Sequence, residues 1–266
     1  MISVVTPTYN TPPDVLARTW ASLKTQTHTD WEWVVWDDST DDRVWRQVYG
    51  YAADERYRIR AHRSMSHSGS IGQVKRQAFM VAEGDVLVEL DHDDELMPDA
   101  LVSINVAFSD PTVGFVYSDW SEVFADGTTG RYPDGWAFGY GSDYLDPEWG
   151  WVMSAPPINR ITMSHIVSAP NHARAWRAST YRTVGGHDPR LTVADDYDLV
   201  VRTILAADWC HIPRLLYRQH IGPWTAQRQR NDLIQLVVAD IAERYAPDLD
   251  ARLGVASTLN DAAAAD

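Results

Sequence analysis

The sequence predicts an α/β protein whose core is a doubly wound, mostly parallel sheet. In the first half of the 266-residue chain, short β-rich runs alternate with helical patterns at the spacing of a parallel sheet with crossover helices. Apolar residues make up 45% of the chain and aromatic residues 11%, as expected of a packed globular protein. Polar runs follow three predicted strands, at 8–10, 37–38 and 91–94. Because parallel strands end at one edge of a sheet, we expect these runs to converge there.

The elements of the first half follow from local pattern. Residues 2–6 are β-rich and are stopped by Pro7 and a turn-prone run at 10–13. Apolar residues at helical spacing predict helices near 15–23 and 44–51 and at 73–83. Apolar or alternating runs predict further strands at 33–36, 57–60 and 85–90.

The second half is less regular. Residues 113–117 predict a fifth strand, and Asp126-Gly127 marks the turn of a hairpin. Residues 130–160 are rich in glycine, proline and aromatics, and we expect a long irregular binding loop there. A helix is predicted to begin at Asp195, where acidic residues suit the helix dipole. A late amphipathic helix is predicted around 233–241.

Charge and cysteine usage exclude several classes of protein. The formal charge of -14 argues against a binder of nucleic-acid polymers and against a basic membrane-binding face. Cys210 is the only cysteine, so an intrachain disulfide and a cysteine-based zinc site are excluded. No apolar run approaches the roughly 18 residues of a membrane span, and no signal peptide is recognised. We therefore expect a cytoplasmic protein.

The acidic run at 91–94, Asp91-His92-Asp93-Asp94, has two interpretations. Like charges about 4 Å apart repel by roughly 4 kcal/mol at an effective dielectric of about 20. A hard divalent cation bound by carboxylate oxygens relieves this repulsion. A solvated acidic loop that caps the following helix relieves it as well. The run alone leaves both interpretations open.

Several motifs in order resemble those of family 2 glycosyltransferases of the GT-A fold, over roughly residues 1 to 220. They are Val4-Val5-Thr6-Pro7-Thr8-Tyr9-Asn10, Val35-Trp36-Asp37-Asp38-Ser39, Ala82-Glu83-Gly84-Asp85 leading to the acidic run, Val184-Gly185-Gly186-His187-Asp188, Ala194-Asp195-Asp196-Tyr197-Asp198-Leu199 and Tyr217-Arg218-Gln219-His220. The resemblance implies a Rossmann-like sheet with a nucleotide-sugar half at 1–119 and a smaller acceptor and catalytic-base half at 120–220. A helical extension at 221–254 and a disordered tail at 255–266 complete the expected organisation.

The resemblance also implies an activity. The family transfers a sugar with inversion from a nucleotide-diphosphate donor, here expected to be a UDP-sugar, to an acceptor hydroxyl. The acceptor would belong to a glycan, glycolipid or protein, and the cofactor would be Mn²⁺ or Mg²⁺. Sequence motifs do not specify the sugar or the acceptor.

Donor-site residues carry over position by position. Thr8, Tyr9 and Asp38 should line the nucleoside pocket, although Asp38 also suits a turn or helix cap. Asp91 is expected at the ribose and the metal, and Asp93 on the metal, while Asp94 has no assigned role.

Two further donor-side assignments depend on the resemblance. Lys75 and Arg76 occupy the helix where relatives carry an Arg-Asn pair, so one of them should reach the donor. His220 falls where some relatives contact the metal or the diphosphate with a late histidine. For all three residues, an ordinary surface or core role is the alternative.

Asp196 matches the second acid of the family's paired-acid motif, and the resemblance makes it the general base. An inverting displacement needs one base to take the acceptor proton. Asp195 stands where the family usually has Glu, and it is expected near the acceptor. The alternative for both acids is charge at a helix N-terminus alone.

The acceptor side is the least determined. Trp149 and Trp151 are expected to stack on sugar faces, although twelve tryptophans mean that several must be core residues. His172 and Arg174 fall in a segment resembling an acceptor-proximal strand, without assigned roles. The Gln-x-x-Arg-Trp motif of processive relatives is not matched at 227–230, so transfer of single sugars is expected.

Two other functions compete with sugar transfer. A sugar nucleotidyltransferase shares the sheet topology, but it would carry a basic, glycine-rich loop after the first strand, where this chain has Thr6-Pro7-Thr8-Tyr9-Asn10. A non-catalytic carbohydrate- or nucleotide-binding relative would be expected to lack the base or the metal acids.

Overall fold

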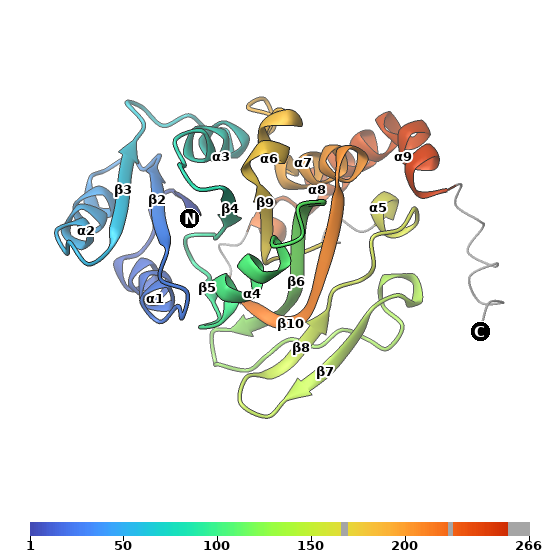
Figure 1. Cartoon of the computed structure of the whole chain (residues 1–266), viewed down its shortest axis with the longest axis horizontal. Helices are drawn as coiled ribbons and strands as arrows, with labels where there is room; N and C mark the ends of the chain where they lie inside the picture. The colour runs from blue at the N-terminus through green and yellow to red at the C-terminus, as the bar shows by residue number, and fades with distance from the viewer. Residues whose placement is uncertain (166–169, 223–225, 255–266) are drawn as a thin grey trace.

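The parallel half of the sheet forms one end of the molecule. The computed structural model describes residues 1–165, 170–222 and 226–254. Strand β1 (Ile2–Thr8) pairs in parallel with β2 (Trp31–Asp37) and with β4 (Val86–Glu89), and β2 pairs in parallel with β3 (Arg58–Arg63). The resulting order is β3-β2-β1-β4. Figure 1 shows β3, β2 and β4 in this order, with the N-terminus between β2 and β4. The four strands predicted in this half are therefore confirmed.

The second half of the sheet mixes directions. Strand β9 (Arg174–Arg177) is antiparallel to both of its neighbours, β4 and β6 (Val113–Phe124). Strand β10 (Asp208–Ile221) is parallel to β6 and carries the short β5 (Glu95–Leu96) on its other side. The described residues thus form one sheet of ten strands, largely parallel as predicted.

Helices cover both faces of the sheet, as in a doubly wound fold. Helices α1 (Pro13–Lys24), α2 (Arg43–Ala52) and α4 (Ala100–Ala107) lie on one face, and α3 (Ile71–Met80), α6 (Ala178–Thr183) and α7 (Asp195–Ala206) on the other. The C-terminal α8 (Ala226–Arg244) and α9 (Ala246–Leu253) pack near α7, and α5 (Thr162–His165) contacts α8 (Figure 1). The predicted late helix is confirmed as α8.

The stretch 130–160 is more ordered than we predicted. After the short 3-10 helix η1 (Ala137–Gly139), β7 (Ser142–Asp146) and β8 (Gly150–Ser154) form an antiparallel hairpin that joins the sheet through β6. The expectation of one long irregular loop is therefore wrong. The turn predicted at Asp126-Gly127 is present, with Gly127 at φ 82°. The predicted tail at 255–266 lies outside the described residues.

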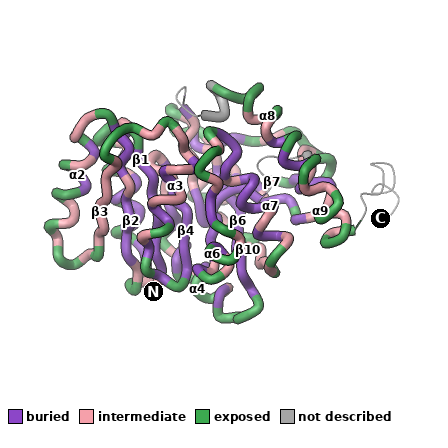
Figure 2. Tube along the Cα trace, turned by 90° about the horizontal axis from the view of Figure 1, so that it is seen from above, coloured by how far each residue is buried: buried purple, intermediate pink, exposed green. Residues whose placement is uncertain are grey.

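Large aromatic side chains fill the core between these layers. Trp33, Trp120 and Trp176 are fully buried, and Trp20 stacks on Trp33 with ring centroids 5.2 Å apart. Figure 2 shows the buried positions running along the strands, with exposed positions on the outer helices and loops. Several of the tryptophans therefore serve packing, as the composition required.

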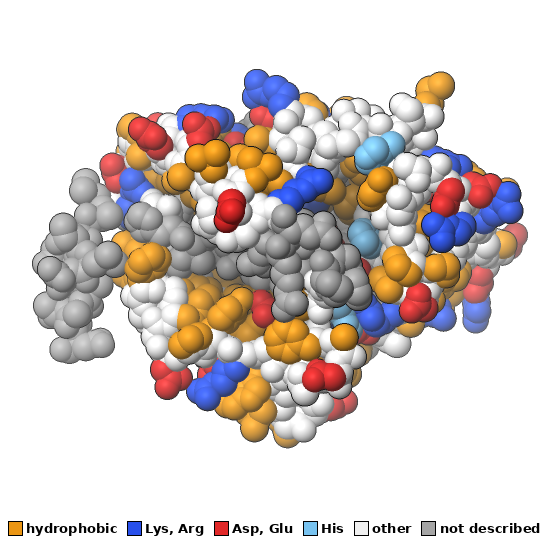
Figure 3. All heavy atoms as spheres, turned by 180° about the vertical axis from the view of Figure 1, so that it is seen from behind, with side chains coloured by type: hydrophobic (Ala, Val, Ile, Leu, Met, Phe, Trp, Pro, Cys, Tyr) orange, Lys and Arg blue, Asp and Glu red, His pale blue; other side chains and the backbone are white. Residues whose placement is uncertain are grey.

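The surface carries both signs of charge. On the face drawn in Figure 3, lysine and arginine side chains alternate with acidic ones around the periphery and do not gather in one basic patch. Within the described ranges, no helix combines the length and the apolar character that a membrane crossing requires.

Candidate active site

The carboxyl ends of β1, β2 and β4 meet at one edge of the sheet. Thr8 lies opposite Asp37 in the parallel register, and its Oγ1 donates to Asp37 Oδ1 at 3.3 Å. The Asp38 N–H donates to the Thr8 carbonyl at 2.9 Å. The acidic run begins two residues after β4, which is the other neighbour of β1. The predicted convergence of polar runs follows directly from this topology.

Asp38 binds the loop at residues 67–68, which lies against Tyr9. It is only 2% exposed, and its Oδ2 accepts hydrogen bonds from Ser68 N–H at 3.0 Å and Ser68 Oγ at 2.9 Å. His67 Nδ1 lies 2.8 Å from the same oxygen. Tyr9, which is 46% exposed, stacks on the His67 ring with centroids 4.4 Å apart. Asp38 thus binds a neighbouring loop, and the N-cap of α2 is Asp42.

His67 and Ser68 were missed by the sequence analysis. They lie in the Ser-His-Ser-Gly run just before α3, where Ser70 caps the helix by accepting from the Gln73 N–H. That polar run between a strand and a capped helix was the available signal.

The acidic run is divided between the interior and the solvent. Asp94 is 2% exposed; its Oδ1 accepts from the His220 N–H at 2.7 Å and its Oδ2 from the Tyr217 hydroxyl at 2.8 Å. Burial, together with the charges of Asp93 and Asp91, raises the pKa of Asp94 well above its usual value. Asp94 therefore ties the acidic loop to β10, a structural role that the sequence did not reveal.

Asp91 and Asp93 keep more of their carboxylates accessible. Their side chains are 30% and 16% exposed. Asp91 Oδ2 lies 3.5 Å from His172 Nε2, and Asp93 Oδ1 lies 4.0 Å from His92 Nδ1. In the described part of the chain, no group of three or more His, Cys, Asp or Glu side chains is arranged to hold a metal ion. One or two carboxylates completed by substrate phosphate oxygens remain a usual arrangement for Mg²⁺.

His220 points to a different partner from the one expected. Its Nε2 lies 2.6 Å from Glu95 Oε2, one residue beyond the acidic run. Burial would raise the pKa of Glu95, but the hydrogen bond and charge of His220, with Arg218 and Arg18, lower it overall. This pairing does not favour the predicted contact between His220 and a metal.

The paired acids begin α7 and face different ways. The Asp196 side chain is 28% exposed; its Oδ2 accepts from Arg174 Nη1 at 2.8 Å and its Oδ1 from the Tyr197 N–H at 2.8 Å. The Asp195 side chain is 5% exposed, and its Oδ2 lies 3.7 Å from both Lys75 Nζ and His187 Nε2. An inward-facing Asp195 does not favour the predicted contact with an acceptor. Asp196 is the acid that an incoming group can reach.

The two acids also differ in pKa. Burial, reinforced by the charges of Asp196 and Glu89, raises the pKa of Asp195 to about 7. Burial would also raise the pKa of Asp196, but the charges of Arg174 and Lys75 outweigh this effect and lower the pKa of Asp196 to about 2. Adjacent acids with separated pKa values are typical of sites where one carboxylate stays ionised.

A buried network of charges lies behind Asp196. Glu89, at the end of β4, is fully buried; its Oε1 lies 2.6 Å from Lys75 Nζ and its Oε2 accepts from Arg174 Nε at 2.9 Å. Burial alone would lower the pKa of Lys75, yet the charges of Asp195 and Glu89 raise it well above its usual value. Lys75 is therefore held inside the protein as a cation, which does not favour its predicted donor contact.

Arg76 is likewise engaged within the protein. Its Nη1 donates to the backbone carbonyls of Gly185 and of His187, the latter at 3.1 Å. Arg76 thus holds the loop that leads to α7, and a direct donor contact stays a prediction.

The two expected acceptor tryptophans flank the start of β8. The guanidinium of Arg218 lies 4.9 Å from the Trp149 ring centroid, and that of Arg131 lies 4.4 Å from the Trp151 ring centroid. Both tryptophans are half-buried. Each ring carries a cation on one face, and contact with an acceptor stays a prediction.

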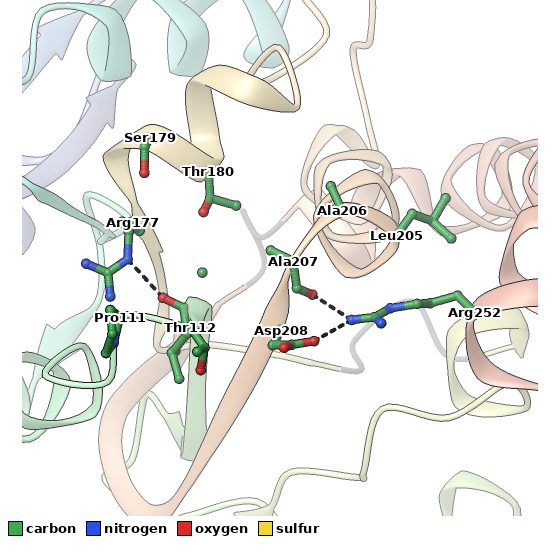
Figure 4. Close-up of a pocket in the computed structure, with 12 residues that line it drawn as sticks. Pro111, Thr112, Arg177, Ser179, Thr180, Leu205, Ala206, Ala207, Asp208 and Arg252 are labelled. Carbon is green, nitrogen blue, oxygen red and sulfur yellow. Dashed lines mark hydrogen bonds and ion pairs between the residues drawn. The ribbon is translucent and has the colours of Figure 1, made fainter.

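A separate hollow opens at the other ends of the strands. It has a volume of about 400 Å³ and lies near Val113 and Asp208, where β6 and β10 begin. Arg177 and Arg252 stand on opposite sides of it (Figure 4). Both arginines donate to backbone carbonyls, Arg177 to that of Val113 and Arg252 to that of Ala207. None of the predicted site residues lines this hollow.

Comparison with known proteins settles the family. Residues 3–176 match the model of glycosyl transferase family 2. The chain belongs to this family.

It is 30% identical over 232 residues to the uncharacterized protein y4gI of Sinorhizobium fredii, covering 85% of this chain and 23% of that protein. It is 26% identical over 224 residues to the O-antigen biosynthesis protein RfbC of Myxococcus xanthus, covering 84% of this chain and 16% of RfbC. The chain thus spans less than a quarter of either relative.

Solved structures confirm the GT-A fold of this glycosyl transferase family 2 member. TarS of S. aureus in complex with UDP-GlcNAc has a TM-score of 0.65 and 17% identity, covering 94% of this chain and 72% of that one. The mannosyltransferase PcManGT of Pyrobaculum calidifontis, in complex with GDP-Man and Mn²⁺, has a TM-score of 0.60 and 17% identity, covering 100% and 75%. At this identity the likeness shows the fold alone.

Proposed function

We propose that this family 2 glycosyltransferase chain transfers a sugar, with inversion, from a nucleotide-diphosphate donor to an acceptor hydroxyl, with Asp196 as the general base. One observation carries the proposal. A continuous series of contacts runs from Asp91 to His172 at 3.5 Å, on to Arg174 at 3.0 Å, and to Asp196 at 2.8 Å. The donor-side acid and the proposed base thus belong to one site, which transfer between bound donor and acceptor requires.

The nucleoside would bind against Tyr9 and Asp38. Tyr9 offers an exposed ring already stacked on His67, and Asp38, which the 67–68 loop holds beside that ring, would accept a hydrogen bond from a base N–H. Thr8 would shape the pocket from the end of β1. The complexes of TarS with UDP and UDP-GlcNAc support a UDP-sugar as the donor.

A divalent cation, Mn²⁺ or Mg²⁺, would be held by Asp93 and Asp91 together with the donor diphosphate. The accessible carboxylates fit a hard cation, and the complex of PcManGT with GDP-Man and Mn²⁺ supports the same assignment. The cation would neutralise charge on the departing nucleoside diphosphate. In a chain of net charge -14, that neutralisation matters for binding any diphosphate.

Asp196 would act on the acceptor. The acceptor oxygen forms a bond to the anomeric carbon while the bond to the diphosphate breaks on the opposite face, and Asp196 takes the proton from that oxygen. The hydroxyl proton becomes acidic as the new bond forms, so a carboxylate of low pKa suffices as the acceptor of that proton.

The remaining assignments are part of the same proposal. Residues 120–220 would supply the acceptor side for a glycan, glycolipid or protein, with Trp149 and Trp151 as sugar-stacking candidates. Residues 1–119 would form the nucleotide-sugar half and residues 221–254 a helical extension, in a cytoplasmic protein.

The experiment is incubation of the protein with a panel of nucleotide sugars and Mn²⁺. We expect slow release of free nucleoside diphosphate from one donor, which a binding protein without catalytic activity does not give. Release of inorganic pyrophosphate from a nucleoside triphosphate and a sugar phosphate would instead indicate a nucleotidyltransferase. Failure to bind any nucleotide, with or without metal, would refute the proposal.

Replacement of the base tests the mechanism. Asp196→Asn keeps the shape of the side chain but removes the proton acceptor, so we expect transfer to fall by roughly 10²–10⁴-fold with donor affinity nearly intact. Turnover and calorimetric donor binding are measured side by side. Asp248→Asn is the matched control, because Asp248 is an exposed acid in the first turn of α9. Loss of donor binding in Asp196→Asn would show that the base is misplaced.

A further inference from the structure

Glu89 is a fully buried acid in an otherwise apolar strand, and the proposed reaction gives it no task. We propose that Glu89 is a positioning residue for the base: it fixes the orientation in which Arg174 presents its guanidinium to Asp196. This inference rests on the proposed function, since it concerns the same site.

The geometry of Arg174 carries the first step. Its Nε donates to Glu89 Oε2 at 2.9 Å, and its Nη1 donates to Asp196 Oδ2 at 2.8 Å. The guanidinium is a rigid plane, so a bond that fixes Nε also fixes the direction of Nη1. The third nitrogen, Nη2, lies 3.0 Å from His172 Nε2. The position of the Asp196 carboxylate therefore depends on a bond made on the far side of Arg174.

The sheet explains why Glu89 and Arg174 meet. They are direct partners in the antiparallel pairing of β4 with β9. Side chains of directly opposed residues project from the same face of a sheet, here toward α3 and α7, which carry Lys75 and Asp196. Lys75 holds the other carboxylate oxygen of Glu89 at 2.6 Å, so the carboxylate has a single orientation.

Stability alone does not account for this arrangement. Buried ion pairs are often replaceable by apolar residues of similar volume without loss of stability. Here the ions link four elements, α3, β4, β9 and α7, and end on the one carboxylate of the network that is 28% exposed. The same strand, β4, leads two residues later to Asp91 on the donor side. One rigid strand thus positions both the donor acid and the support of the base.

The test is Glu89→Gln in the full chain. Glutamine keeps the volume but has one acceptor oxygen for two cations, Lys75 and Arg174, and no charge. In either orientation the amide N–H₂ faces one of these donors, so the paired contacts that fix Arg174 are lost. We expect kcat to fall by about tenfold or more, while donor KM and the Kd for the nucleoside diphosphate change by less than about threefold.

Glu32→Gln is the matched control. Glu32 is also a fully buried glutamate on a core strand, bonded to Ser3 Oγ at 2.5 Å and to the Glu83 N–H at 2.8 Å. It lies near the first residue of β2, whereas Asp37, at the proposed site, is the last residue of that strand. We expect Glu32→Gln to keep kcat even if it lowers stability. An equal loss of kcat in the two folded variants would overturn the inference.

A double-mutant cycle identifies the route of the effect. If Glu89 acts through Arg174, Glu89→Gln should cause no further loss of kcat in an Arg174→Met background. Independent, additive losses would contradict the inference. Should Glu89→Gln fail to fold, Lys75→Met/Glu89→Leu removes one cation with the anion and leaves Arg174 Nε without its acceptor. It is compared with Lys75→Met, and unchanged kcat in that comparison also overturns the inference.

These outcomes separate the inference from the proposed function. If the wild-type protein turns over no donor, the proposed function fails, and the positioning role fails with it. If the wild type is active, Asp196→Asn is not, and Glu89→Gln behaves like Glu32→Gln, only the positioning role fails.

Discussion

At the scale of single residues, neighbouring acids acquire different properties from their surroundings. Asp195 and Asp196 are adjacent, yet one is buried beside Lys75 and His187 while the other reaches the surface against Arg174. A similar division affects the acidic run, where Asp94 is a structural anchor and Asp93 stays accessible. The sequence places these acids close together but does not show which of them is buried.

Asp195 makes stability depend on pH. Its pKa is about 7 in the folded protein against 3.8 for the free side chain, so between about pH 4 and 7 the folded state holds the extra proton. Stability then falls as pH rises through this window. We expect the unfolding free energy of the wild type, relative to Asp195→Asn, to fall by roughly 1–2 kcal/mol from pH 5 to 7. Denaturant titrations at the two pH values measure it.

The comparison with Asp195→Asn isolates one group. The charged and titratable groups that face Asp195 are Lys75 on α3, Glu89 on β4, Arg174 on β9, Asp196 on α7 and His187 in the preceding loop. Burial lowers the pKa of His187 to about 3, which gives the opposite pH dependence, but His187 is present in both proteins. Parallel pH profiles for wild type and variant would contradict the assignment.

At the scale of elements, the contact between α3 and the loop before α7 sets the position of the paired acids. Gly72, in the first turn of α3, donates its N–H to the Leu191 carbonyl at 3.1 Å. Ser70 donates its hydroxyl to the carbonyls of Pro189 and Leu191. A Cβ at residue 72 would lie 2.1 Å from the Asp188 carbonyl oxygen, so only glycine fits this approach.

Gly72→Ala should therefore be destabilising. The new methyl group meets backbone atoms that cannot move aside, and we expect a loss of about 1–3 kcal/mol in unfolding free energy, measured by denaturant titration. Gly50→Ala is the control, since a Cβ at this exposed position in α2 meets nothing within 4 Å. We expect it to stabilise by about 0.5–1 kcal/mol. Similar effects at both sites would mean that the contact of α3 with the loop is loose.

The elements of the first half were predictable because each has a local signal. Alternating strands and helices, with Pro and Asn in the turns, placed β1 to β4 and α1 to α3 within a few residues. The β7–β8 hairpin was not predictable, because its strands include exposed and half-buried residues without a clean apolar pattern. β10 was not predicted as a strand either. It pairs with β6 through three register shifts, which obscure any alternation.

At the scale of the whole molecule, topology explains both what was predicted and what was missed about the site. Parallel strands brought Thr8, Asp38 and the acidic run together, as their positions after strands implied. A strand near Arg174 was expected only from the resemblance, and its antiparallel place between β4 and β6, which pairs Glu89 with Arg174, was not predicted. A glutamate in the run Val86-Leu87-Val88-Glu89-Leu90 was the available signal, since a charged residue in a buried strand needs partners.

Donor binding should stabilise the whole fold, because the proposed site draws on β1, β2 and the loop after β4. A ligand at about 100 times its Kd adds about 2.7 kcal/mol of stability. For a chain of this size, we expect UDP and Mn²⁺ together to raise Tm by roughly 5–10 °C, measured by thermal unfolding. Asp93→Ala should remove the part of the shift that depends on Mn²⁺ and leave any shift caused by UDP alone. The proposed site needs both the metal and the diphosphate at one edge of the sheet. If Mn²⁺ alone raised Tm as much as UDP and Mn²⁺ together, the cation would bind elsewhere. An unchanged manganese response in Asp93→Ala would exclude that carboxylate as a ligand.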